Sequence, residues 1–347
     1  MLSKGLAKVL QWLLTDRANE LTRESKACQR QGKLGGAGLV QTLVFGFLAR
    51  PRATCEELAQ TANSLGYAVS PQAVDQRCTA PASDCLRRLA EEAVQQVIIT
   101  QPALPPLLQK FSSVELLDST TLTLPDALAD QWPGCGTNSP QGGRAVLKVQ
   151  TRLDFLGGRL RLQFDSGRSS DSRTPLQSED VRERSLHLRD LGYFELDTLA
   201  LIDQRQAYYV SRLQQGTAVY DDQNQRLDLV KFLRQQTGNV VDVRVRLGTE
   251  HRLACRLVAV RLPKQIAAKR RRKLLKKAKK KGYTPQAATL ELRGWSIYVT
   301  NASVTLLSVD EVVALMRLRW QIELLFKLWK SDGGLTFTRS ERPERIL

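Results

Sequence analysis

The stretch RWQIELLFKLWKS, residues Arg319–Ser331, decides how this sequence is interpreted. It carries one carboxylate, Glu323, among apolar residues and three cations. An apolar helix that keeps a single glutamate within a ring of positive charge needs a reason for that glutamate. The three cations are Arg319, Lys327 and Lys330.

A capping box predicts where this helix begins. Ser308 and Glu311 have the spacing of that motif, so we expect the helix to start near residue 309 and to continue through the stretch. At about 3.6 residues per turn, Met316 and the four charged residues fall in one stripe, while the apolar residues fall on another side. The apolar side is therefore core. Its residues are Leu315, Leu318, Ile322, Leu325, Phe326 and Trp329.

The charged stripe has two interpretations. A surface helix with ion pairs between Arg319, Glu323 and Lys327, each worth about 0.2–0.5 kcal/mol, explains it without any ligand. The surplus of cations instead suits a phosphate-bearing ligand, and a carboxylate beside phosphate becomes favourable when a divalent metal lies between them. Magnesium prefers oxygen ligands, so aspartates at strand ends are the partners to seek.

Two aspartates follow apolar strands. Asp118 ends VELLD and Asp190 ends SLHLRD, so both are expected to emerge at the end or edge of a sheet. Spacing alone does not choose them over other acids on polar strand faces or in loops. Those competitors are Asp154, Asp165, Asp171 and Asp180.

The net charge favours a polyanionic partner. The 52 basic and 35 acidic residues give +17, which favours nucleic acid first and an anionic membrane surface second. Residues 264–281 alone hold 11 Lys or Arg and no acid. As a helix or an arm, this basic segment can neutralise phosphates and release counterions. A solvated charged helix without a defined contact is the alternative.

The cysteines and the apolar runs exclude several classes of protein. The six cysteines form no CxxC and have only two histidines to join them, which argues against a zinc finger and against a disulfide framework. The N-terminus lacks a cleavage site of small residues, and the apolar run at 39–49 is about half the length that spans a bilayer. We therefore expect a cytosolic protein that is not associated with a membrane.

Residues 1–100 are expected to be helical. Thr54 and Glu57 form a second capping box, Gly66 ends that helix, and Ser70-Pro71 begins the next. Two helices joined by a short turn outline a helix-turn-helix, which reads DNA, although a plain helical bundle fits equally well. The second helix would present Gln72, Asp75, Gln76 and Arg77.

Beyond the proline-rich break at 101–107, alternating apolar residues predict a mixed α/β sheet. Gly157-Gly158 and Gly248-Thr249 are the expected hairpin turns. The predicted strands lie within 112–125, 147–155, 159–164, 185–190 and 207–213, with a helix over 194–206 and a mostly β region over 216–303.

Three motifs carry a family resemblance. LLDSTTLTLP, LHLRDLGYF and RLRWQIELLFKLWKS resemble the catalytic motifs of DDE insertion-sequence transposases of the IS-four family, which includes the Tn-five-like cut-and-paste enzymes. The third stretch matches the family signature Y-x2-R-x3-E-x6-K at Arg319, Glu323 and Lys330. The motifs stand in the family's order, and the β-rich stretch before the glutamate resembles its insertion subdomain.

The resemblance implies an RNase-H-like (retroviral-integrase-like) core that transfers phosphoryl groups on DNA. Asp118, Asp190 and Glu323 would be catalytic and would hold two Mg²⁺ ions, for which Mn²⁺ substitutes. Water would attack the phosphodiester, and the freed 3′-hydroxyl would attack target DNA, with a hairpin intermediate in the Tn-five-like group. The chain would act on element ends and target DNA in the bacterial cytosol, associated with the nucleoid, and would form a homodimer in the synaptic complex if the C-terminal region is not required.

The same resemblance assigns DNA contacts. Arg319 and Lys330 would grip phosphate near the cleaved end, with Lys327 helping, and the arginines of the basic segment would add to them. Trp320 is expected to stack on an unpaired base, whereas core packing is the preferred interpretation of Trp295. The arginines of the basic segment are Arg270, Arg271 and Arg272.

Two departures from the family matter. Met316 replaces the signature tyrosine and is expected to pack, and the chain ends soon after the catalytic helix, which predicts a truncated C-terminal region. A catalytically impaired DNA-binding or inhibitory protein is therefore the alternative function, and a structure-specific nuclease is a third. The predicted domains are 1–100 (helical, DNA-binding), 108–215 (first part of the core), 216–303 (insertion) and 304–340 (catalytic helix).

Overall fold

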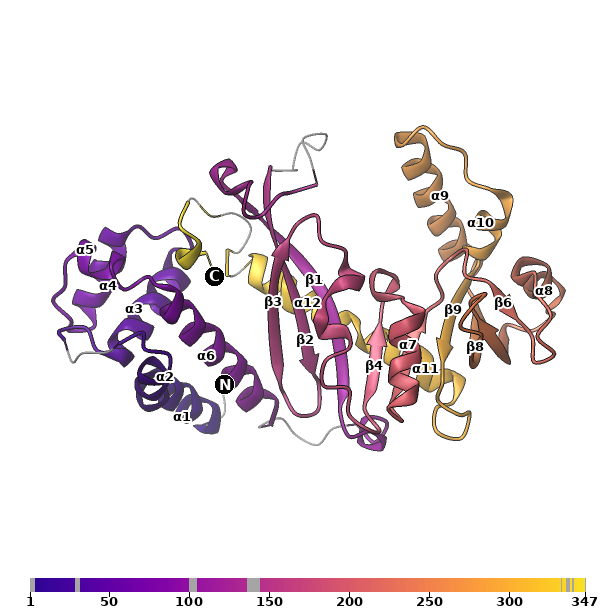
Figure 1. The fold of residues 1–347 in the computed structure, drawn as a ribbon, viewed down its shortest axis with the longest axis horizontal. Helices are drawn as coiled ribbons and strands as arrows, with labels where there is room; N and C mark the ends of the chain where they lie inside the picture. The colour runs from indigo at the N-terminus through magenta and orange to yellow at the C-terminus, as the bar shows by residue number, and fades with distance from the viewer. Residues whose placement is uncertain are drawn as a thin grey trace. The chain divides into compact units, whose positions relative to one another are not determined.

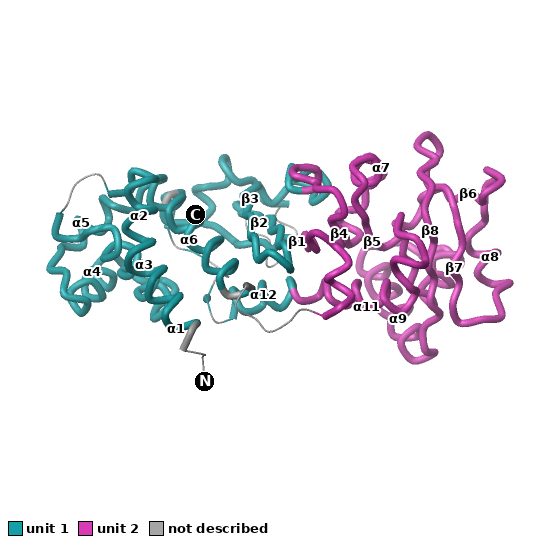
Figure 2. Tube along the Cα trace, turned by 90° about the horizontal axis from the view of Figure 1, so that it is seen from below, with its two compact units in different colours: residues 1–104, 118–176, 322–347 teal, residues 105–117, 177–321 magenta. Residues whose placement is uncertain are grey.

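The structure, a computed structural model, describes residues 4–28, 32–99, 105–135, 144–331, 333–334, 338 and 340–346. It divides into two compact units (Figure 2). Unit 1 combines residues 1–104, 118–176 and 322–347, and unit 2 combines residues 105–117 and 177–321. Because strand β1 (Val114–Leu124) crosses from one to the other, it contributes to both units.

The described residues before 100 are helical, as the sequence predicts (Figure 1). Thr54 and Glu57 form the expected capping box, and Gly66 follows the end of α4 with φ of +90°. The run at 39–49 lies in α3, where Leu39, Val40 and Leu43 are buried. The helices are α1 (Lys4–Trp12), α2 (Ala18–Glu24), α3 (Gly36–Ala49), α4 (Cys55–Ser64), α5 (Pro71–Asp75) and α6 (Ala80–Ile99), with a π turn at Leu13–Arg17 between α1 and α2.

The second helix of the proposed helix-turn-helix is short. Ser70 caps α5 as expected, but α5 has five residues, and Asp75 pairs with Arg342 at 2.7 Å and also with Arg345. Arg77, in the turn after α5, donates to Ala73 O of that helix at 2.8 Å. Two of the four side chains that would read DNA are therefore engaged within unit 1.

The sheet of unit 1 has the order β3-β2-β1. Strands β2 (Ala145–Asp154) and β3 (Leu160–Ser166) form the predicted antiparallel hairpin, and Gly158 has φ of +69° in its turn. Both faces of β2 are buried, although alternation predicted one. Two of its polar residues hydrogen-bond to the segment 169–176: Lys148 Nζ donates to Asp171 Oδ1 at 2.9 Å, and Arg152 Nη1 donates to Leu176 O at 3.4 Å.

The sheet of unit 2 starts with the first residues of β1 and continues β4-β5-β9-β8-β7-β6. The β1–β4 and β4–β5 pairs are parallel and the others antiparallel, so the predicted mixed sheet is confirmed. The β-rich region continues the core sheet, because β9 pairs with both β5 and β8. The strands are β4 (Leu186–Arg189), β5 (Tyr208–Arg212), β6 (Val219–Tyr220), β7 (Val240–Leu247), β8 (Leu253–Arg261) and β9 (Trp295–Thr300).

Helices flank this sheet, and α7 and α11 pack against β5. Trp295 lies in the core of unit 2 at 9% exposure, as expected. The basic segment is a helix, α9, and no described helix is long and apolar enough to cross a membrane. The helices are α7 (Leu196–Gln204), α8 (Leu229–Gln235), α9 (Lys264–Lys280), α10 (Ala287–Leu292), α11 (Val309–Leu318) and α12 (Trp320–Ser331), the last lying mostly in unit 1.

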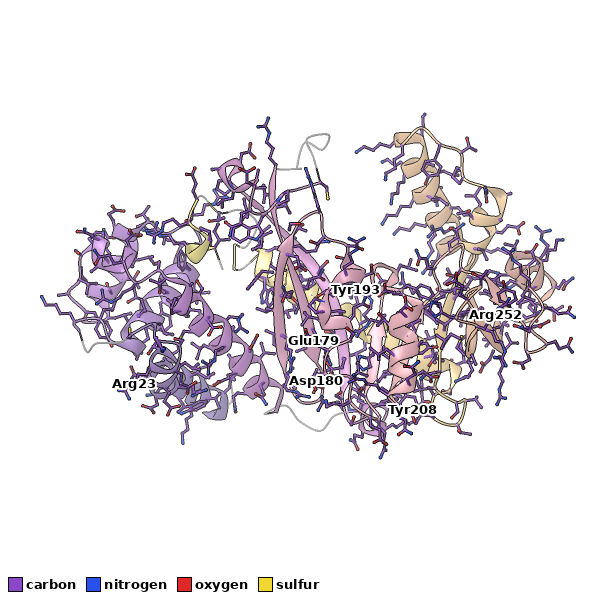
Figure 3. All side chains as sticks on the ribbon, in the orientation of Figure 1. Arg23, Glu179, Asp180, Tyr193, Tyr208 and Arg252 are labelled. Carbon is purple, nitrogen blue, oxygen red and sulfur yellow. The ribbon has the colours of Figure 1, made fainter. Side chains whose placement is uncertain are left out.

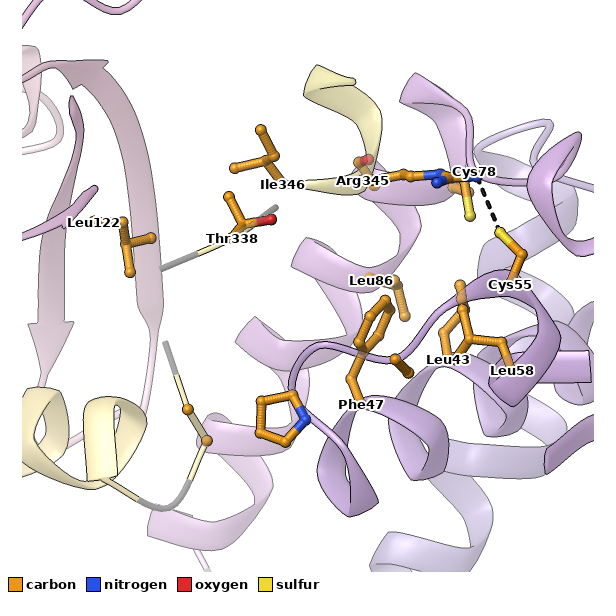
Figure 4. A pocket seen from close by; sticks show the side chains of 16 residues that line it. Leu43, Phe47, Cys55, Leu58, Cys78, Leu86, Leu122, Thr338, Arg345 and Ile346 are labelled. Carbon is orange, nitrogen blue, oxygen red and sulfur yellow. Dashed lines mark hydrogen bonds between the residues drawn. The ribbon is translucent and has the colours of Figure 1, made fainter. Parts of the chain in front are cut away.

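The C-terminal segment packs on the helices of unit 1 (Figure 4). Arg345 Nη2 donates to Cys55 Sγ at 3.0 Å, and a cavity of about 270 Å³ between the segment and the helices is lined by apolar residues, including Phe47 and Ile346. The predicted boundary at 101–107 falls partly outside the described residues, since 101–104 are not among them.

Candidate active site

Asp190 and Arg212 leave neighbouring parallel strands at the same end. Arg189 of β4 is in register with Ser211 of β5, so the residues that follow lie side by side. Asp190 precedes a 3₁₀ turn, and its carbonyl accepts from Tyr193 N at 3.0 Å (Tyr193 is labelled in Figure 3). Its side chain makes no capping hydrogen bond, so its carboxylate is available for other partners.

Two arginines flank the Asp190 carboxylate. Oδ1 lies 3.5 Å from Arg212 Nε, and Oδ2 lies 3.7 Å from Arg319 Nη2. The Arg319 side chain is only 6% exposed. Within the described residues, Oδ1 of Asp190 is buried and has no hydrogen-bond partner. A buried carboxylate oxygen in that condition is costly unless a cation or donor reaches it, and oxygen is the ligand that Mg²⁺ prefers.

A buried polar network supports Asp190 from within β4. Arg189 and His187 are fully buried, and Arg189 Nη2 lies 3.1 Å from His187 Nδ1. Because the guanidinium can only donate, Nδ1 accepts and the proton resides on Nε2, which faces Ser185 Oγ at 2.8 Å. Arg189 also donates to Gln177 O at 3.4 Å. These bonds fix the strand that delivers Asp190.

Arg319 occupies the junction between α11 and α12. The capping box of Ser308 and Glu311 starts α11 as predicted, but the expected single helix is interrupted at Arg319. Met316 is buried at 5% exposure, so it packs as expected.

Two cations hold the chain that enters α11. Lys110 binds Glu311 at 2.6 Å and Leu306 O at 3.0 Å. Arg256 Nη1 donates to Ala302 O at 2.8 Å and Leu307 O at 2.9 Å, while its Nη2 pairs with Asp242 at 2.6 Å. The position of Arg319 therefore depends on these two residues.

Asp118 lies within a strand, which corrects the expectation that it ends one. β1 continues to Leu124, and β2 is its hydrogen-bonded neighbour in the sheet of unit 1. The sequence suggested an end at Asp118 because polar residues begin there. In the structure the same change appears as a change in burial, since Val114 to Leu117 are buried and most residues from Asp118 onward are only half-buried. Oδ1 of Asp118 accepts from Ser119 N at 2.8 Å.

The competing aspartates have local partners. Asp171 Oδ1 accepts from Lys148 Nζ at 2.9 Å and from Ser119 Oγ at 3.0 Å. Asp154 is buried and accepts from Leu156 N at 3.0 Å in the hairpin turn. These contacts give both carboxylates a structural role in unit 1.

The first turn of α12 contains Glu323, which is half-buried. Lys327 is exposed, whereas burial lowers the pKa of Lys330. Trp320 is 54% exposed and thus accessible to a ligand. Ile322 and Phe326 are the buried members of the apolar side.

The three predicted ligands are divided between the units. Asp118 and Glu323 belong to unit 1 and Asp190 to unit 2. Within the described ranges, no group of three or more His, Cys, Asp and Glu side chains is arranged to hold a metal ion. The structure thus brings Asp190 to Arg319, and the convergence of the three carboxylates stays a prediction.

Comparison with known proteins decides the family. The family described as "Transposase DDE domain" matches residues 109–346, which is more than half of the chain and includes all three carboxylates. The chain belongs to the DDE transposase family. Membership implies an RNase-H-like fold, with which the mixed sheet agrees, and an enzyme of metal-dependent phosphoryl transfer on DNA. Members of the family generally use a divalent metal.

Individual DDE transposases agree with this assignment. The chain is 29% identical to the transposase for insertion sequence element IS231F of Bacillus thuringiensis subsp. israelensis, over 94% of this chain and 72% of that protein. It is 25% identical to the transposase for IS1151 of Clostridium perfringens, over 95% and 74%. It is 28% identical to the putative transposase InsL for IS186A of Escherichia coli K12, over 61% and 59%.

Sequence reasoning missed Arg212 in this transposase. The signal was present, because Arg212 ends a strand that runs parallel and adjacent to the one before Asp190. The arginines predicted to bind DNA differ in accessibility: Arg271 and Arg272 are exposed, whereas Arg270 is half-buried and donates to Trp295 O at 3.4 Å. Arg270 therefore also ties α9 to the sheet.

Proposed function

We propose that this DDE transposase cleaves DNA at the ends of an insertion sequence and joins them to target DNA. The observation that carries this proposal is the match over residues 109–346, which includes Asp118, Asp190 and Glu323. The names of the relatives, each a transposase for an insertion sequence, support the same substrate.

Asp118, Asp190 and Glu323 are the residues that would hold the divalent metal, which we propose to be a pair of Mg²⁺ ions, with Mn²⁺ as a substitute. When bound, such a pair activates the attacking oxygen and stabilises the leaving oxygen of the phosphodiester. The buried Oδ1 of Asp190 supports this role, because among the described residues it accepts no hydrogen bond and pairs with Arg212 Nε only at 3.5 Å.

The cations of α12 and its junction would position the DNA. Arg319 is held beside Asp190, so a phosphate bound by its guanidinium lies next to that carboxylate. Lys327 and Lys330 would bind further phosphates, and the exposed Trp320 would stack on an unpaired base. The exposed Arg271 and Arg272 of α9, with Arg270, would add contacts to the phosphate backbone of the DNA, which we propose to be that of the nucleoid.

The functional test is cleavage of a linear duplex that carries the element's own ends. We expect wild-type protein to nick it in Mg²⁺ or Mn²⁺ and not in EDTA. Asp118→Asn, Asp190→Asn and Glu323→Gln should each lower the rate by more than the roughly 10–100-fold that loss of an outer-shell partner costs. Asp165→Asn is the matched control, and its rate should remain close to wild type.

A second measurement does not depend on turnover. Fe²⁺ bound in place of Mg²⁺, with ascorbate and peroxide, cleaves the polypeptide next to the metal. We expect cuts near residues 118, 190 and 323, and their loss in Asp190→Asn. Absence of nicking by wild-type protein, or cuts elsewhere in the chain, would contradict the proposal.

Joining two element ends requires two active sites, so we propose a homodimer in the complex with DNA, with the two-fold symmetry common among oligomers. Light scattering on a gel-filtration column, with and without end DNA, measures this. A complex whose mass never exceeds one chain bound to one DNA duplex would contradict it.

A further inference from the structure

A groove runs beside α9 in unit 2, between that helix, the loop after β5 and the segment around α10. Its volume is about 720 Å³. Gln215 Nε2 donates to Thr289 Oγ1, which joins the loop after β5 to α10. Tyr283 and Gln286 add neutral donors to its lining.

The groove is lined by five cations and by no acid among the described residues. The acids nearby have other partners: Glu291 binds Arg234 at 2.6 Å, and Asp190 flanks Arg212 at 3.5 Å outside the groove. Positive groups that share one hollow without an anion repel each other. The five are Arg212, Arg270, Lys273, Lys277 and Arg293.

Arg270 is subject both to burial and to that repulsion. Burial lowers the pKa of its guanidinium first, and the neighbouring charges of Arg212 and Arg293 lower it further. The group stays cationic and is held by Trp295 O at 3.4 Å and Ser296 Oγ at 3.3 Å. An anion in the groove would relieve this cost, because it adds the attraction that the lining lacks.

The cations form a track and not a single point. Lys273 and Lys277 are about one turn apart on α9, a rise of about 6 Å, which exceeds the roughly 3.4 Å rise along the duplex axis from one phosphate of a strand to the next, so the two ammonium groups can contact different phosphates. Arg212 lines another part of the groove, and its Nε lies 3.5 Å from Oδ1 of Asp190.

We infer that this groove binds the phosphate backbone of a DNA strand, and that Arg212 links the bound strand to Asp190. The inference rests on the proposed function, which makes DNA the substrate. It assigns the main contacts of α9 to Lys273, Lys277 and Arg293 together with the half-buried Arg270, and gives Arg271 and Arg272, which do not line the groove, a lesser part.

Two variants of the same helix test this inference. Lys273→Gln/Lys277→Gln removes two groove cations, and Lys276→Gln/Lys280→Gln removes two exposed lysines with the same spacing that do not line the groove. Both lower the charge of α9 equally. Circular dichroism melting checks that each variant keeps the wild-type fold.

Binding of a fluorescein-labelled duplex is measured by anisotropy in EDTA over a series of NaCl concentrations. The plot of the logarithm of the DNA association constant against the logarithm of salt concentration has a negative slope. The groove variant should reduce the magnitude of this slope by about two, one for each phosphate contact, and the control variant by less than one. Equal effects of the two variants on DNA binding would overturn the inference. Binding to anionic phosphatidylglycerol vesicles is measured in parallel, and a groove variant that loses vesicle binding but keeps DNA binding would also overturn it. Binding in EDTA is independent of cleavage, so the two tests can fail separately. If wild-type protein nicks DNA but the two variants lose binding equally, the groove is rejected and the proposed function is kept.

Discussion

At the residue scale, Gly158 joins the β2–β3 hairpin to α6. Its φ is +69°, and a Cβ at this position would lie 2.6 Å from Gln95 Cα and 2.8 Å from Gln95 O. Gly158→Ala should therefore cost about 1–2 kcal/mol for the left-handed backbone and about 1–3 kcal/mol for the overlap with backbone atoms. Urea unfolding measures the loss of stability.

Gly216 is the control for this prediction. Its φ is +93°, but nothing lies within 4 Å of an added Cβ. Gly216→Ala should thus cost only the backbone part, about 1–2 kcal/mol. Equal losses for the two variants would mean that the hairpin moves away from α6 without penalty.

At the element scale, the start of α11 depends on pH. Hydrogen bonds from Lys110 and from the Ser308 backbone lower the pKa of Glu311 below its ordinary 4.5. Because the folded-state pKa is the lower one, the stabilisation is fully present above about pH 4.5 and is lost as pH falls through the folded value. Glu311→Gln keeps the capping hydrogen bond but loses the charge that pairs with Lys110, so it should cost about 0.2–1 kcal/mol at pH 7 and less near pH 3.

Melting temperatures of wild type and variant from pH 3 to pH 7 measure this difference. Asp310→Asn is the control, since Asp310 is exposed in the same first turn and has no contact with Lys110. Its effect should be smaller at every pH. A Glu311→Gln penalty that stays constant with pH would show that the carboxylate charge does not contribute.

The elements that the sequence predicts well are those set by local contacts. The capping boxes at Thr54 and Ser308 act within three residues, and the turn at Gly158 acts within its own hairpin. The continuation of β1 beyond Asp118 and the burial of both faces of β2 depend on chain segments far away in the sequence. No periodicity encodes such pairings, so these features could not be read in advance.

The candidate site follows the same rule. Asp190 was proposed because it follows an apolar strand, and Arg319 because it matches a motif; the structure places the two side chains 3.7 Å apart. Arg212 was missed, because its importance arises only when β5 pairs in parallel with β4. The division between α11 and α12 at Arg319 was also missed; it is a one-residue interruption at which the backbone stays helical, with φ of −49° and ψ of −31°.

At the scale of the whole molecule, the charge of +17 sets how DNA binding responds to salt. Helix α9 alone contributes ten cations within Lys264–Lys280. If about 6–10 phosphates are contacted, affinity should fall by about 10³–10⁵ between 50 and 200 mM salt. Anisotropy titrations with a duplex in EDTA measure the slope. A nearly flat response would mean that the basic surface does not meet the DNA backbone.

The composition of unit 1 has a consequence for synthesis on the ribosome. The unit needs residues 1–104 and also residues 322–347, which are translated after all of unit 2. At about 5–20 residues per second, the N-terminal helices of the nascent chain wait roughly 10–40 s for the segment that covers Phe47 and Leu58. During that interval their apolar surface is open to chaperones and to other nascent chains.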